Sequence, residues 1–515
     1  MASKPIPMSS VDAAWYHMDN ATNLAMVSGV ILTREPLDFA RVKETYLQRL
    51  ASFDRFRQCV VETGAPYHTP HWETYPYFNI DDHVHHVALP EPRDKQALLA
   101  LLSDLSSTPL DPRRPLWQVH VVDDVDGGSA LVMRFHHCVG DGTAMIAVAQ
   151  QLFDTTPDAP IPLPAPKKPA SGGMLDAIFR PARRALRSST QLLGSAVEGG
   201  VDLVRHPSQV LDLTELAARS AGSAAGLLLK STDPVSPIKG QLGVLKRVAW
   251  SEPIALDEVK EIGKRTGAKV NDVLVAVVSG ALRRYLLERH AELEGHSIRA
   301  IVPVDLRPPG RAFELGNHFG LVFLELPVGF SDPFERLGLT KRNMDALKQS
   351  PEAHVLLAII DFFGRTPKSI SDIAVNIFTS KASVVMTNVA GPREPRYLAG
   401  SAIDRMIFWV PHPGSIGMGI SILSYNGGVS LGIIADAGLV PDPEHIAAEF
   451  DREFQRLLAA VRVDGKTLPA AEEQHCAGRT VKGQPCRNHP LAGSTYCRVH
   501  QPETSRQAAK TPRKK

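Results

Sequence analysis

Two adjacent histidines, His136 and His137, stand where an expected strand ends and an expected helix has not yet begun. Residues 129–133 before them are apolar and free of breakers, which predicts a buried strand. Residues 143–153 after them carry apolar side chains at helical spacing, which predicts a helix. The ordinary pKa of histidine is about 6.5, so a neutral imidazole in this loop could take a proton from an alcohol. The pattern predicts proton-transfer chemistry.

The same loop contains an aspartate and two glycines. Asp141 could fix the tautomer of a histidine or lock the loop through a salt bridge, and Gly142 permits close approach of a ligand to the backbone. Two other interpretations stay open. The histidines could bind a metal together with Cys138 and Asp141, although the spacing matches no common zinc pattern, or the loop could be purely structural. We favour catalysis.

The run from His136 to Gly142 matches the HHxxxDG motif of CoA-dependent acyltransferases related to chloramphenicol acetyltransferase. Further motifs make the chain resemble, more narrowly, the bacterial wax ester synthase/diacylglycerol acyltransferases. These motifs are Met8–Trp15, Pro115–Trp117, Asn271–Asp272, Val302–Arg307, Leu315–Gly320 and Thr387–Pro392. The resemblance runs from about residue 8 to about residue 463.

The resemblance implies an α/β fold in which two chloramphenicol-acetyltransferase-like domains face each other across a channel. We expect the first domain at residues 1–156, with the HHxxxDG motif, and the second at 241–466. The implied reaction moves a long-chain acyl group from acyl-CoA to diacylglycerol or a fatty alcohol, which gives triacylglycerol or wax ester. Another HHxxxDG acyltransferase, with a polyketide or amine acceptor as in condensation domains, is the alternative. A third interpretation is a non-catalytic scaffold that binds lipid or nucleic acid.

Roles for individual residues also follow from the resemblance. His137 would be the general base, His136 and Asp141 would orient the loop, and Gly142 would leave room for the thioester. No covalent acyl-enzyme is required, and we expect Cys138 to point away from the substrate.

Two asparagines are candidates for stabilising the oxyanion. They are Asn271 of the Asn-Asp motif and Asn388. Asn271 stands just before the apolar run 273–282, and asparagine is a favoured N-cap, so helix capping is an alternative role for this residue.

A chain of 515 residues is too long for one ordinary core and suggests two domains with additions. The net charge of +2 gives no information about the fold. The opening residues have no apolar core typical of a signal peptide, and no run of eighteen apolar residues occurs. Five cysteines do not make a disulfide framework. We therefore expect a cytoplasmic protein in peripheral contact with the inner membrane face or lipid droplets.

Residues 157–240 form an expected connector between the two domains. Its first part, 157–173, is rich in proline and should be semi-rigid. Residues 174–193 form a basic amphipathic pattern that suits an anionic lipid surface, although the same stripe could pack on its own protein.

The last part of the chain has a different composition. Cys476, Cys486, Cys497 and His500 supply three thiolates and one imidazole, a ligand set that structural zinc prefers. We expect a small zinc-binding module at 474–502, in which the metal would provide the folding energy, followed by a disordered basic tail at 503–515. The basic charge of this segment could contact nucleic acid or anionic membrane.

Overall fold

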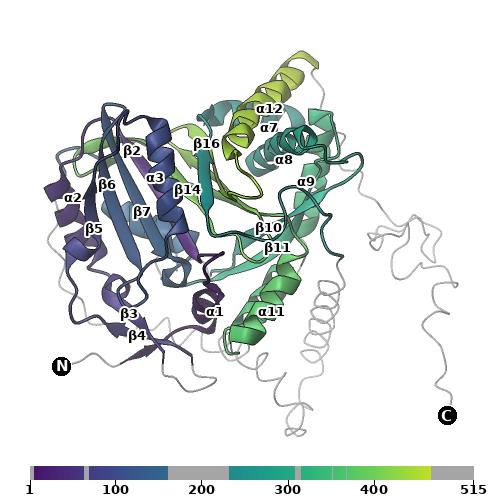
Figure 1. Ribbon diagram of the computed structural model, residues 1–515. Helices are drawn as coiled ribbons and strands as arrows, with labels where there is room; N and C mark the ends of the chain where they lie inside the picture. The colour runs from purple at the N-terminus through teal and green to yellow at the C-terminus, as the bar shows by residue number, and fades with distance from the viewer. Residues whose placement is uncertain are drawn as a thin grey trace, which may run out of the picture. The chain divides into compact units, whose positions relative to one another are not determined.

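The computed structural model describes residues 5–62, 69–160, 231–307, 315–348, 350, 352–366 and 368–464 (Figure 1). The described residues all belong to one compact unit. The expected zinc module at 474–502, the basic tail and the amphipathic segment 174–193 lie outside the described residues. In the ranges that are described, no helix combines the length and the apolar character needed to cross a bilayer.

A six-stranded sheet carries the strand that leads to the histidines. Its order is β13-β14-β2-β7-β6-β5, and only the β5–β6 pair is parallel. The strands are β2 (Met26–Thr33), β5 (Val84–Val87), β6 (Trp117–Val125), β7 (Gly128–His136), β13 (Tyr397–Leu398) and β14 (Ser401–Trp409). The expected strand at 129–133 lies within β7 and is confirmed.

The second large sheet is mixed and has the order β11-β10-β12-β15-β16-β8, with β9 also paired to β16. Its strands are β8 (Lys246–Trp250), β9 (Ile254–Ala255), β10 (Ile298–Asp305), β11 (Phe319–Leu326), β12 (Val384–Ala390), β15 (Met418–Tyr425) and β16 (Gly428–Asp436). Asn426 and Gly427 both have positive φ, as a tight β15–β16 hairpin turn requires. A small third sheet consists of β1 (Ile6–Pro7), β3 (Gln58–Val61) and β4 (His71–Thr74).

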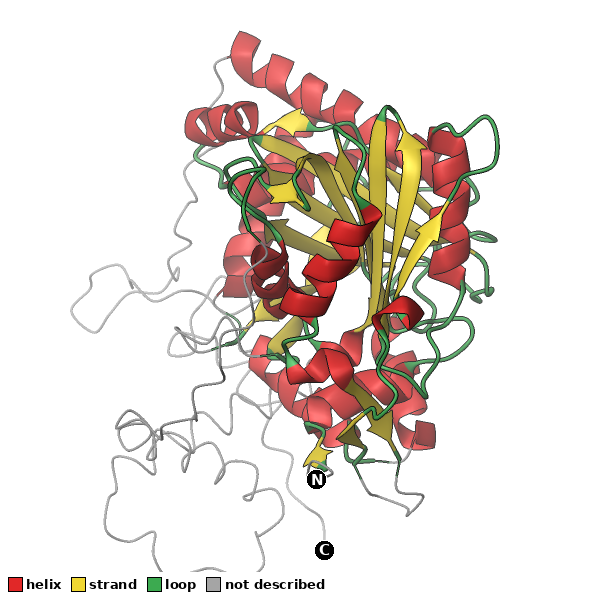
Figure 2. Cartoon of the chain, turned by 90° about the vertical axis from the view of Figure 1, so that its left-hand side faces the viewer, coloured by secondary structure: helices red, strands yellow, loops and turns green. Residues whose placement is uncertain are grey.

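Helices lie on both sides of the strands, as Figure 2 shows. They are α1 (Ser10–Met18), α2 (Phe39–Thr45), α3 (Lys95–Ser107), α4 (Gly142–Leu152), α7 (Leu256–Thr266), α8 (Val270–Glu288), α9 (Pro333–Lys348), α10 (Glu352–Phe363), α11 (Lys368–Thr379) and α12 (Pro443–Asp464). The expected helix at 143–153 corresponds to α4 and is confirmed. Strands and helices together confirm the mixed α/β class.

The six-stranded sheet is built from both ends of the chain. β14 pairs with β2, with Trp409 opposite Ser28, although β14 belongs to the region 241–466 that we assigned to a second domain. Both expected acyltransferase-like domains therefore contribute strands to one sheet. The domain boundaries drawn from the sequence stay a prediction.

The two faces of this sheet pack into different cores. Val30, Val132 and Ile407 pack in one cluster with Leu98 and Leu102 of α3, which lies across this face in Figure 1. Their neighbours in the strands belong to the other core cluster; they include Ile31, Leu131 and Met406. The separation follows from the period of two in a strand, which sends successive side chains to opposite faces. The face that carries Ile31, Leu131 and Met406 lines the candidate active site.

Candidate active site

The two histidines lie at the end of β7, where the chain leaves the sheet. His136 is the last residue of the strand, and a single 3₁₀ turn, His137–Val139, follows it. The backbone N–H of His137 donates to the carbonyl oxygen of Ala25 at 2.7 Å. Asp141 then caps α4, because its side chain accepts a hydrogen bond from the N–H of Ala144 at 3.0 Å. The loop is thus fixed at both ends.

The imidazole of His137 is held by an asparagine from the other half of the chain. Its Nδ1 lies 2.9 Å from Oδ1 of Asn317. The amide nitrogen of Asn317 donates to Oδ1 of Asp12 at 2.7 Å and to the carbonyl oxygen of His137 at 2.8 Å. Both partners are acceptors, so the amide oxygen must face the ring, and Nδ1 must carry the proton. The lone pair of His137 is therefore on Nε2, as a general base requires.

Helix α1 supplies two of the residues that hold this arrangement. Its N-cap Ser9 accepts a hydrogen bond from the N–H of Asp12 at 3.1 Å. Asp12 and Trp15, three positions apart, share one face of the helix. The indole of Trp15 stacks on the His137 ring, with centroids 4.0 Å apart and planes inclined by 12°. Asp12 therefore fixes Asn317, and Trp15 fixes the plane of the imidazole.

Burial lowers the pKa of His137 below its ordinary value, against the opposing effect of the Asp141 carboxylate and the hydrogen bond to Asn317. The ring is therefore neutral at pH 7 and able to accept a proton. Burial raises the pKa of the Cys138 thiol well above its usual value, and the side chain is fully buried. A protonated, enclosed thiol is a poor nucleophile, in line with the expectation that Cys138 takes no part in covalent chemistry.

His136 has a different environment from His137. It is 4% exposed, and its Nδ1 accepts a hydrogen bond from the N–H of Cys138 at 3.1 Å. Burial, followed by the neighbouring His137, lowers the pKa of His136 to about 3, so this ring stays neutral. Its contact with the backbone holds the 3₁₀ turn rather than a ligand.

Asp141 forms a buried ion pair with Arg307, at 2.8 Å between Oδ2 and Nη2. The same carboxylate accepts the N–H of His318 at 2.9 Å. Of the two roles considered for Asp141, the structure therefore shows the salt bridge. It ties the start of α4 to the segment around β10 and β11, and so connects the two large sheets next to His137.

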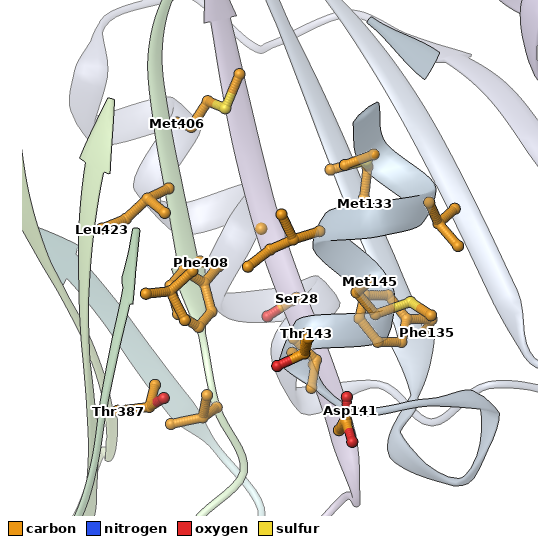
Figure 3. Close-up of a pocket in the computed structure, with 18 of the residues that line it drawn as sticks. Ser28, Met133, Phe135, Asp141, Thr143, Met145, Thr387, Met406, Phe408 and Leu423 are labelled. Carbon is orange, nitrogen blue, oxygen red and sulfur yellow. The ribbon is translucent and has the colours of Figure 1, made fainter. Parts of the chain in front are cut away.

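A cavity of about 340 Å³ opens beside His137. It is lined by residues of both large sheets and of α4, and most of these side chains are apolar (Figure 3). His137, Asp141 and Gly142 all line it, whereas His136 and Cys138 are outside the set of lining residues. A Cβ atom added to Gly142 would meet nothing within 4 Å. His137 thus faces a space that can admit an apolar substrate.

The two candidate asparagines contact each other. Nδ2 of Asn388, on β12, donates to Oδ1 of Asn271 at 2.9 Å, and Asn388 lines the cavity. Asn271 is not a helix cap, so that alternative was wrong. The N-cap of α8 is Lys269, and its N–H donates to the carboxylate of Asp272 at 2.8 Å. Asn271 lies in the first turn instead.

Four residues of the site received no individual role from the sequence: Asp12, Trp15, Arg307 and Asn317. All four lie within the motifs that carried the resemblance. The motifs do not indicate which distant side chains contact each other. Asp12 and Asn317 form a hydrogen bond although they are some 300 positions apart in the sequence. The metal interpretation of the loop gains no support, because the described residues include no group of three or more potential ligands placed to hold a metal.

The neutral imidazole of His137 thus lies at an apolar cavity lined by both large sheets. The chain belongs to the wax ester synthase/diacylglycerol acyltransferase family. The catalytic domain of this family matches residues 8–274, and its C-terminal domain matches residues 315–458. The chain is thus an acyltransferase enzyme, and acyl transfer to diacylglycerol or an alcohol is the activity of its family.

Individual relatives agree with this assignment. A putative diacylglycerol O-acyltransferase of Mycobacterium tuberculosis is 27% identical over 475 residues, which cover 88% of this chain and 90% of the relative. The fold resembles the wax ester synthase/diacylglycerol acyltransferase from Marinobacter aquaeolei VT8, with a TM-score of 0.62, 19% identity, and coverage of 89% of this chain and 100% of that one. The first condensation domain of the calcium-dependent antibiotic synthetase has a TM-score of 0.58 at 15% identity, with 90% and 98% covered.

Proposed function

We propose that this enzyme transfers a long-chain acyl group from acyl-CoA to the hydroxyl of diacylglycerol or a fatty alcohol, with His137 as the general base. The observation that carries the proposal is the hydrogen bond between Nδ1 of His137 and Asn317, which leaves Nε2 free beside the apolar cavity. The family assignment supports the choice of lipid substrates.

The chemistry follows from this geometry. Nε2 of His137 takes the proton of the acceptor hydroxyl while the oxygen attacks the thioester carbonyl carbon, and a tetrahedral oxyanion forms. When the oxyanion collapses, the carbon–sulfur bond breaks, and the imidazolium returns the proton to the departing CoA thiolate. A base positioned in this way contributes about 10²–10⁴-fold to the rate. His136, Asp141 and Gly142 act by holding the loop and leaving space for the thioester.

The oxyanion needs hydrogen-bond donors aimed at it. We assign this role to the amide of Asn388, which lines the cavity and gives one of its two N–H groups to Asn271. The second N–H remains for the substrate oxygen. Asn271, outside the cavity lining, then acts as a positioning residue for Asn388.

The test is an assay of the purified full-length protein with long-chain acyl-CoA, offered a fatty alcohol or a diacylglycerol. His137→Ala should lower the rate by about 10²–10⁴-fold with the fold intact. His354→Ala, at an exposed histidine of α10, is the matched control and should keep the wild-type rate. Near-normal turnover by His137→Ala would show that His137 is not the general base. A preference for carrier-protein thioesters over acyl-CoA would favour a condensation-like enzyme.

Two further assignments rest on the sequence. The lipid substrates and the basic pattern at 174–193 support peripheral contact with a membrane or lipid droplet. The ligand set Cys476, Cys486, Cys497 and His500 supports a structural zinc ion in the C-terminal module. Metal analysis of the reduced protein should find one zinc per chain, and Cys497→Ser should lose it. If the wild-type protein is purified without zinc, the proposed zinc-binding module is wrong.

A further inference from the structure

Gly29 interrupts an otherwise bulky apolar face of the six-stranded sheet. In the strand register, Gly29 of β2 is opposite Met133 of β7 on one side and opposite Phe408 of β14 on the other. The next row on the same face consists of Leu131, Ile31 and Met406. Paired residues of neighbouring strands point to the same face. Gly29 therefore leaves a gap between two large side chains where every neighbouring position is filled.

The gap opens into the cavity that contains the base. Gly29, Met133 and Phe408 line the same space as His137. Figure 3 shows Met133 and Phe408 on opposite sides of the strand that carries Ser28, the residue next to Gly29. Met26, three residues before Gly29, is opposite His136 in the register. A strand rises about 3.3 Å per residue, so the gap lies roughly 10 Å along the sheet from the start of the catalytic loop.

Core residues form part of the wall of this cavity. Tyr46, Leu50, Trp117 and Leu152 line it and are each at most 4% exposed. An apolar cavity with buried walls suits a single hydrocarbon chain that ends in a methyl group. An acyl thioester carries one such chain, whereas diacylglycerol carries two on one glycerol. A fatty alcohol also carries one chain, but only the acyl chain is present in the reaction with either acceptor, so we take the acyl chain as the occupant.

We propose that the acyl chain of the thioester lies along the face of the sheet over Gly29, and that the gap between Met133 and Phe408 determines which chain lengths are accepted. Gly29 is thus a specificity-determining residue for acyl-CoA. The inference rests on the proposed function, since it needs a thioester placed at His137. Acyl chains that end before the gap do not reach it, and longer acyl chains extend through it.

The space at Gly29 is narrow enough for small substitutions to matter. A Cβ atom added there would lie 3.0 Å from the carbonyl oxygen of Ile407 and 3.4 Å from Cβ of Phe408. Alanine therefore requires a shift of a few tenths of an ångström, and valine adds two further methyl groups to the gap. Truncation of Phe408 has the opposite effect, because it widens the passage.

The experiment measures kcat/KM for saturated acyl-CoA from butyryl to palmitoyl with one fixed alcohol. Gly29→Val should lower the ratio of long-chain to short-chain kcat/KM by roughly 10- to 200-fold, the range for one methylene-sized change in an apolar pocket, and Gly29→Ala by less. Phe408→Ala should move the preference toward longer chains. Val132→Ile is the matched control: it adds a methylene to the opposite face of the same sheet, away from the cavity lining, and should leave the ratio unchanged.

The outcomes separate this inference from the proposed function. If the wild-type enzyme transfers no acyl group from any acyl-CoA, the proposed function fails. If the wild type is active but the Gly29 and Phe408 variants lose rate equally for all acyl lengths, the inference at Gly29 is wrong. A second series uses one fixed acyl-CoA and alcohols of varied length, and a change in alcohol-length selectivity in the Gly29 and Phe408 variants, in place of a change in acyl-length selectivity, overturns the inference as well. Should Gly29→Val not fold, Phe408→Ala and Met133→Ala decide the question by the direction of the shift.

Discussion

Nδ1 of His137 lies 2.9 Å from Oδ1 of Asn317, although the two residues are 180 positions apart in the chain. The contact means that the position of the proton on the His137 ring is set from the opposite half of the protein. Asp12, near the N-terminus, fixes the asparagine in turn through its amide nitrogen and its backbone N–H. The tautomer that the proposed mechanism needs is therefore fixed only when three distant segments have assembled.

Asn317 should be detectable through the pH dependence of the reaction. Burial holds the pKa of His137 below 6.5, so the wild-type enzyme should keep its activity as the pH falls below that value. Asn317→Asp retains an acceptor at Nδ1 but adds a negative charge that favours the imidazolium. We expect the pKa of His137 to rise, and the acid limb of kcat/KM to move to higher pH.

Asn317→Ala serves as the comparison for this prediction. It removes the acceptor without adding charge, so kcat should fall while KM for acyl-CoA changes little. Its loss should be smaller than the ~10²–10⁴-fold expected for removal of the base. Identical pH profiles for the wild type and Asn317→Asp would show that Asn317 is only structural.

The ion pair between Asp141 and Arg307 should contribute strongly to stability. Their side chains are 6% and 2% exposed, so Arg307→Met would leave a buried carboxylate without its partner. Breaking such a pair on one side costs about 3–5 kcal/mol. Arg462→Met is the matched control, because its partner pair with Glu261 is 45% and 29% exposed and should contribute at most about 1 kcal/mol. Denaturant unfolding of both variants measures the difference, and equal losses would contradict the prediction.

The sequence predicted the strand, the loop and the helix around His137 because the local pattern is strong there. The apolar run of β7, the histidines and the amphipathic α4 follow each other without ambiguity. Motifs also located Asn317 and Arg307 without giving them a role. Pairing of β14 with β2 could not be predicted, because no short-range pattern records which distant strand a given strand joins. The gap at Gly29 depends on that pairing, so it could not be predicted either.

The alternative role of Asn271 as a helix N-cap was wrong for a local reason. Asparagine is a good cap in general, but here the helix begins at Val270, and the carboxylate of Asp272 binds the N–H of Lys269. A charged acceptor in the first turn satisfies the free N–H group and interacts well with the helix dipole. Asn271 is thereby released to contact Asn388.

Buried histidines should make the protein sensitive to mild acid. Burial lowers the pKa of His136 to about 3 and the pKa values of His120 and His412 to about 4. In the unfolded chain these groups have pKa values near 6.5, so below that pH the unfolded state binds protons that the folded state does not. The free energy of unfolding must therefore fall as the pH is lowered from 6.5 toward 4, by up to about 1.4 kcal/mol per pH unit for each histidine.

The interval from pH 6.5 to 5 isolates this effect, because ordinary carboxylates titrate mainly below it. Denaturant unfolding across the interval should give a falling free energy, and His120→Gln should reduce the slope by about one proton. His120 is suitable for this substitution because it is 8% exposed and does not line the cavity. It lies on β6, outside the loop that carries His137. An exposed histidine such as His354 should change nothing when it is replaced by glutamine. A flat profile for the wild type between pH 6.5 and 5 would mean that these rings are protonated in the folded protein.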